Sequence, residues 1–190
     1  MVKPRIYESN PIRPTPQIEY DWQKGHIKLD APAAMAYTGF LGNLAIPEVR
    51  FASGAVIRKV EVKNPAGMPY PVTKDELYVA ITLASCDGQP LGVTKKAVIS
   101  AVSTSFNTGF ELDTAKRPLP EFKGAEVKNR GNEPVLVARG GCIVECQALA
   151  GMSYILRDYH MQELGKGTIG KDGALTISSD MAVFVVELSR

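Results

Sequence analysis

Histidine, cysteine and tryptophan are scarce in this sequence, which narrows the chemistry open to it. The 190 residues include two histidines, three cysteines and one tryptophan. Catalytic triads and zinc sites draw on histidine and cysteine. The sequence contains no G-x-S-x-G and no H-E-x-x-H motif. We therefore expect a non-enzymatic protein with no catalytic residues, no cofactor and no metal.

Long apolar runs and blocks of one charge are also missing. No stretch approaches the roughly 20 apolar residues of a membrane helix, and residues 1–30 hold no apolar core of a signal peptide. The formal net charge is +2 and no basic cluster exceeds two residues, as in Lys95-Lys96, which argues against a broad nucleic-acid surface. We expect neither a membrane nor a nucleic-acid partner.

Three cysteines do not make a fully paired disulfide framework. Cys142 and Cys146 lie in an apolar run that reads as extended chain, which separates them by roughly 13 Å, too far for a bridge. We expect three free thiols, buried positions for Cys142 and Cys146, and a reducing compartment.

Glycine and proline are plentiful, at 17 and 13 residues, and period-2 alternation of apolar residues dominates after Trp22. The pattern predicts a mainly β fold, a single β-sandwich or barrel-like domain with few short helices. A helix fits residues 31–44, and a helical turn fits 159–164. The predicted strands are residues 26–30, 55–63, 77–84, 93–102, 121–127, 134–138, 142–146, 153–159, 174–178 and 181–188.

Some strands carry finer predictions. In 55–63, Val56, Val60 and Val62 should share one face, with Ile57 among the polar residues of the other. The apolar run 77–84 should be buried on both faces. Arg139-Gly140-Gly141 should be the turn of a hairpin between 134–138 and 142–146.

Residues 1–22 differ from residues 23–190, the β-rich domain. Pro4, Pro11, Pro14 and Pro16 favour extended chain there. Two interpretations stand side by side: a disordered tail, or an extended N-terminal arm that orders on a neighbouring subunit. The candidate partner-binding residues are the large apolar and basic side chains of the arm: Arg5, Tyr7, Ile12, Arg13, Ile18, Tyr20 and Trp22.

Three motifs look chemical and are better explained structurally. Residues 165–170 match G-x-G-x-x-G, but no crossover helix follows to face a phosphate. Asp158 and His160 are spaced as a pair on one strand face, and an exposed loop explains them as well. Cys142, Cys146 and His160 are three potential zinc ligands, yet cysteines in β-branched runs are usually small buried hydrophobes.

Two stretches carry a family resemblance. The turn Asp87-Gly88-Gln89-Pro90-Leu91-Gly92-Val93 precedes a predicted strand, and residues 134–146 lead through Gly151 to the glycine-rich segment 165–173 and a last strand. This order resembles tailed-bacteriophage capsid decoration (cement) proteins over about residues 77–188. Residues 107–132 and the proline-rich arm depart from the family pattern.

The resemblance implies a virion structural protein on the capsid surface, assembled in the host cytoplasm. Its partner would be the major capsid protein, whose lattice it would bind and stabilise. The family's small β domains are often trimers, so a homo-oligomer is implied. The alternatives are another phage tail or minor capsid structural protein, or a carbohydrate-binding β domain.

Overall fold

The fold was examined in a computed structural model of the 190-residue chain. It describes residues 17–21, 26–40, 48–63, 78–113 and 126–190. Their secondary structure is almost entirely β, which confirms the predicted fold class, and the sheet does not close into a barrel. In order these elements are β1 (Ile18–Asp21), β2 (His26–Ala31), β3 (Ala34–Phe40), β4 (Glu48–Arg50), β5 (Val56–Lys63), β6 (Tyr78–Ser85), β7 (Lys96–Asp113), β8 (Glu126–Glu145), the 3-10 helix η4 (Gln147–Leu149), β9 (Ser153–Arg157), β10 (Glu163–Thr168), β11 (Ala174–Ile177) and β12 (Val185–Ser189).

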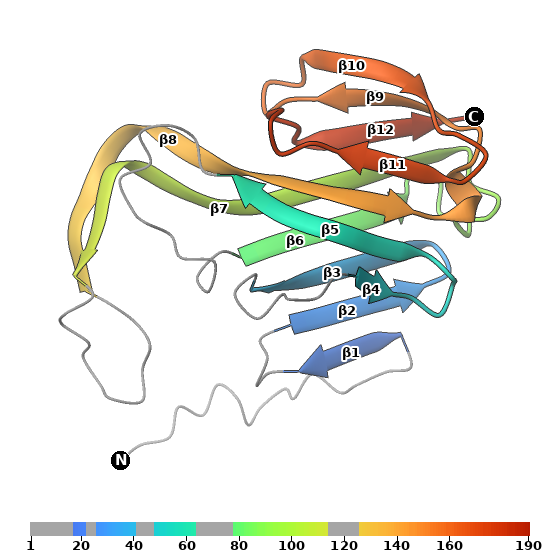
Figure 1. The fold of residues 1–190 in the computed structure, drawn as a ribbon, viewed down its shortest axis with the longest axis horizontal. Helices are drawn as coiled ribbons and strands as arrows, with labels where there is room; N and C mark the ends of the chain where they lie inside the picture. The colour runs from blue at the N-terminus through green and yellow to red at the C-terminus, as the bar shows by residue number, and fades with distance from the viewer. Residues whose placement is uncertain (1–16, 22–25, 41–47, 64–77, 114–125) are drawn as a thin grey trace.

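Two antiparallel layers share the long strands β7 and β8 (Figure 1). The larger layer runs β1-β2-β3-β6-β7-β12-β9-β10, and the smaller runs β4-β5-β8-β11. Residues 102–113 of β7 pair with residues 126–139 of β8. From Arg139 to Glu145, β8 pairs with β5 and β11 instead. The connection makes the domain sandwich-like while keeping one continuous hydrogen-bonded sheet.

One apolar cluster fills the space between the layers. Ile81, Ile99 and Val186 face it from the larger layer, and Ile57 and Val144 from the smaller. Each of these side chains is at most 1% exposed. Burying such a side chain contributes about 1.5–3 kcal/mol, so this core holds the two layers together.

The apolar run at β6 is buried mainly on one face, against the prediction of burial on both. Val79, Ile81 and Leu83 are buried, while Ala80 and Thr82 between them are only half-buried. Small residues at the alternate positions mark the outer face of the layer. A run of apolar letters did not distinguish them from core residues.

The predicted face assignment in β5 is wrong. Ile57 is 1% exposed in the core, and Val60 and Val62 also pack against the core. The pairing with β8 shifts register between Arg58 and Glu61, and Lys59 has a φ of 51°. A β-bulge adds one residue and reverses the alternation beyond it, so odd and even positions both reach the interior.

The predicted helix over 31–44 is also wrong within the described residues. Residues 34–40 form β3 between β2 and β6. Met35, Tyr37 and Gly39 are buried and alternate with half-buried neighbours, which is the period of a strand. Burial between two neighbouring strands overrides the helix propensity of the alanines. Within the described ranges, no helix is long and apolar enough to cross a membrane.

Arg139-Gly140-Gly141 lies inside β8 and is not a hairpin turn, which corrects the prediction. A Cβ on Gly140 would lie 3.0 Å from the Ala101 carbonyl oxygen, and one on Gly141 would lie 2.7 Å from the Ser179 backbone nitrogen. The two glycines are therefore explained by close backbone approach where β8 passes between layers.

Candidate functional site

The most prominent surface feature is a two-stranded ribbon that leaves the body of the domain (Figure 1). Residues 105–113 of β7 pair with residues 126–137 of β8, and in the described residues neither segment pairs with any other strand. We call these two segments the hairpin arm. Nine residues of strand give it a reach of roughly 30 Å.

Local contacts shape the arm. Phe106 and Phe110 stack with ring centroids 5.0 Å apart. The Asn107 side chain donates to the Arg130 carbonyl at 3.0 Å, and the Thr108 hydroxyl donates to the Pro134 carbonyl at 2.7 Å. These side-chain bonds bridge register shifts at which the regular ladder is interrupted, so the arm has a specified form.

Glycine is required at one position of the arm. Gly131 has a φ of 69°, and a Cβ there would lie 2.5 Å from the Thr108 carbonyl oxygen. Its backbone N–H donates to the Asn129 side chain at 2.9 Å. The backbone of β8 therefore approaches β7 closely at Gly131 in a left-handed conformation, where a residue without a side chain fits.

The arm presents apolar and basic groups to its surroundings. Val127 and Val135 are 51% and 54% exposed. A shallow groove is lined by Ser105, Phe106, Asn107, Phe110, Arg130 and Val135. Arg130 has no ion pair with another described residue, whereas Lys128 pairs with Glu111 at 3.1 Å. Such a surface suits contact with a protein more than reaction chemistry.

The hairpin arm includes residues 107–113 and 126–132 of the region that departs from the resemblance. Sequence reasoning missed the hairpin arm because prolines precede the predicted strand 121–127 and a turn was predicted at 139–141. These signals indicated separate short elements. The available signal was the alternation that runs from 96 to 113 without a proline.

Of the seven residues predicted to contact a partner, two are described. Ile18 and Tyr20 lie in β1, which pairs with β2 at an edge of the larger layer. Arg5, Tyr7, Ile12, Arg13 and Trp22 lie outside the described residues. β1 belongs to the domain's own sheet although it falls within the segment 1–22, and Tyr20 is exposed on it.

Side chains fasten β1 to β2. Glu19 lies 2.6 Å from the Lys28 ammonium and 3.8 Å from His26. The hydrogen bond from Lys28 holds the pKa of Glu19 below its ordinary value of 4.5, despite partial desolvation. The Asp30 N–H also donates to the Gln17 carbonyl at 2.8 Å. Side-chain contacts as well as backbone pairing therefore hold β1 at the sheet edge.

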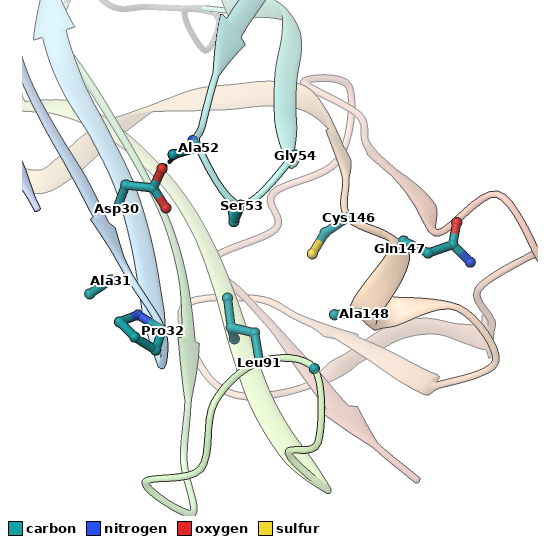
Figure 2. Close-up of a pocket in the computed structure, with 11 residues that line it drawn as sticks. Asp30, Ala31, Pro32, Ala52, Ser53, Gly54, Leu91, Cys146, Gln147 and Ala148 are labelled. Atoms are coloured by element: carbon teal, nitrogen blue, oxygen red, sulfur yellow. Dashed lines mark hydrogen bonds between the residues drawn. The ribbon is translucent and has the colours of Figure 1, made fainter.

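A recess of about 490 Å³ opens between the loops at one end of the sandwich. Figure 2 shows Leu91 and the Cys146 sulfur directed toward it, with Gln147 pointing away. Asp30 accepts a hydrogen bond from the Ala52 N–H there. Burial raises the pKa of the Cys146 thiol, so it stays protonated and weakly nucleophilic at neutral pH. The lining suits a small apolar group and offers no acid–base pair.

The chemical-looking motifs have structural roles. Gly165 and Gly167 lie in β10, and Tyr154 covers Gly167 so closely that a Cβ there would approach its hydroxyl to 2.8 Å. Asp158 accepts bonds from the backbone N–H groups of His160 and Gln162, so its carboxylate shapes a turn. Cys142 and Cys146 are buried and unpaired, as predicted, and Cys86 is exposed and unpaired. No group of three potential metal ligands occurs among the described residues.

Together these features define a mainly β, sandwich-like domain with a projecting hairpin and a fixed edge strand as its candidate contact surfaces. No protein-family model, curated protein or solved structure matches this chain.

Proposed function

We propose that the chain is a virion structural protein that binds the major capsid protein lattice and stabilises it. The hairpin arm is the observation that carries the proposal. A two-stranded ribbon is marginally stable alone in water, yet this one extends from the body with Val127 and Val135 exposed and both outer edges unpaired among the described residues. Contact with a partner protein would cover these groups.

A repeating lattice suits a partner of this kind. Each arm offers modest contacts, but many copies engaged on one lattice gain strength through avidity. Residues 1–16 would add a second contact, since the chain that follows them is held on the sheet edge as β1. The family resemblance in the turn at 87–93 and in residues 134–173 points to the same role, at the capsid surface after assembly in the host cytoplasm.

Capsid binding by point variants tests the arm. We expect Val127→Asp and Val135→Asp to reduce co-sedimentation with capsids of the virus that encodes the chain, because each places a charge in an apolar contact. Val93→Asp is the matched control, since Val93 is 62% exposed on the loop before β7, at the end of that strand away from the hairpin arm. Equal binding by all three variants and the unaltered chain would refute the arm's role.

Truncation tests the N-terminal segment separately. Removal of residues 1–16 leaves β1 intact, whereas removal of 1–22 deletes a strand of the sheet. We expect the shorter deletion to keep the thermal unfolding transition and to lose capsid affinity. Undiminished binding by this truncated chain would show that the segment is a solvated tail.

A carbohydrate-binding role is the second candidate, and one observation favours it. Tyr159 and Phe184 stack at the surface with ring centroids 4.6 Å apart, and exposed aromatic faces bind sugars. A glycan array probed with the unaltered chain and with Tyr159→Ala tests it. Glycan binding lost in the variant would replace the capsid proposal.

A further inference from the structure

β10 is an open edge with unusual length for this domain. Apart from the hairpin arm, four strands pair on one side only among the described residues: β1, β4, β10 and β11. β10 spans six residues, and the others span four, three and four. Proteins commonly shorten or charge an open edge to prevent pairing with other chains, and β10 is the longest of these four edges.

The charges of β10 are arranged by a bulge. The pairing with β9 shifts register between Glu163 and Gly165. In a regular strand, residues three apart point to opposite faces, but here the carboxylate of Glu163 lies 3.2 Å from the ammonium of Lys166. The bulge thus places one negative and one positive side chain on the same face of the edge strand.

This pattern is self-complementary under a two-fold axis. Leu164 is the extra residue of the bulge, since Glu163 and Gly165 on either side of it pair with consecutive residues of β9. If β10 pairs antiparallel with β10 of a second copy about an axis between the two Gly165 residues, each Glu163 therefore lies opposite Lys166 of the other copy. A Cβ at Gly165 would have one neighbour within 4 Å, at 3.8 Å, so the chain is uncrowded where the two strands meet.

We propose that two copies of the chain associate through antiparallel pairing of β10 with β10, in the register that sets Glu163 against Lys166. Such a contact is isologous, as in most two-fold dimers. Backbone hydrogen bonds join the larger layers of both copies into one continuous sheet, and two cross-strand ion pairs fix the register. The contact is independent of the capsid partner.

Sedimentation velocity over a concentration series tests this pairing with charge variants. Glu163→Lys sets two lysines against each other in both pairs, and Lys166→Glu does the same with carboxylates. We expect each single variant to raise the dimer Kd about tenfold or more. Lys96→Glu is the control, because Lys96 is exposed on β7 with no ion pair to a described residue, and we expect an unchanged Kd.

Mixing separates a lost contact from a damaged fold. When the two single variants are combined, the mixed dimer regains a Lys–Glu pair at both positions, so we expect association to recover to near the unaltered level. An unaltered chain that is monomeric at all accessible concentrations would overturn the proposal. So would a dimer or trimer that the single variants leave intact, or a mixture that fails to recover.

Discussion

Replacement of Gly141 by alanine tests the packing of β8 most sharply. A Cβ at this position would lie 2.7 Å from the Ser179 backbone nitrogen and 3.0 Å from the Glu61 carboxylate. The first contact is with backbone, which does not swing aside as a side chain does. Glu61 accepts a hydrogen bond from the Ser179 hydroxyl at 2.6 Å, so the clash also disturbs the bond that holds this loop.

The expected loss follows from overpacking. Extra methyl groups in a packed site cost about 1–3 kcal/mol, and in a chain of this size each kcal/mol lowers Tm by about 2–4 °C. We expect Gly141→Ala to lower the urea midpoint with an unchanged m-value. Gly92→Ala is the matched control, because nothing lies within 4 Å of its Cβ position and its φ is not positive.

Comparing Gly141→Ala with Gly92→Ala shows whether β8 approaches the 178–181 loop as closely as the structure indicates. Gly92→Ala should change stability by less than about 0.5 kcal/mol, or raise it slightly by restricting the unfolded chain. If Gly141→Ala unfolds at the same urea concentration as Gly92→Ala, the close approach of β8 to the 178–181 loop is not real, and a surface turn at 139–141 would again be the better explanation.

Three further predictions concern the core, the acid response and the thiols. Ile99→Ala should cost about 2–5 kcal/mol in urea unfolding, because Ile99 is fully buried between the layers; a loss under 1 kcal/mol would contradict that placement. Hydrogen bonds from Thr94, Lys95 and Ser85 hold the pKa of Asp87 well below its ordinary 3.8, so its carboxylate stabilises the fold fully above that pH and progressively less as the pH falls toward the folded-state pKa. Asp87→Asn should therefore flatten the decline of the urea midpoint at acid pH, and an unchanged decline would show that the loop does not depend on this charge. Finally, a thiol reagent at neutral pH should modify Cys86 alone in the folded chain and all three cysteines in denaturant, since burial raises the pKa of Cys142 to about 12 and also raises that of Cys146; rapid labelling of a second thiol in the folded chain would be inconsistent with the burial.

Sequence pattern predicted the elements whose alternation is local. β2, β6, β9 and the closing strand β12 lie within or overlap the predicted strands. In a half-buried strand, neighbouring residues point to opposite faces, so apolar and polar residues alternate in the sequence. The failures share a different cause. The bulge at Lys59 reverses alternation without marking the sequence. Gly140 and Gly141 in β8 resemble a turn in the sequence. They are needed because Ala101 and Ser179, which are remote in sequence, approach the β8 backbone closely.

The candidate site was predictable only in part. The sequence pointed to the N-terminal segment, where proline and scattered large apolar residues are conspicuous, and the structure describes Ile18 and Tyr20 of that set on the sheet edge. The hairpin arm was not predicted from the sequence, because it consists of the outer halves of two strands whose inner halves lie in the core. Its projection depends on where β8 leaves β7 for the other layer, which is a property of the whole fold.

The most direct test of the proposed capsid-binding function is the capsid binding of a chain that lacks the hairpin arm. Replacement of residues 107–135 by Asn-Gly would join Phe106 to Leu136, which lie opposite each other, through a two-residue turn. We predict that this shortened chain keeps a cooperative unfolding transition and no longer co-sediments with the capsids that retain the complete chain. Equal retention of both chains, or of neither, would contradict the proposal.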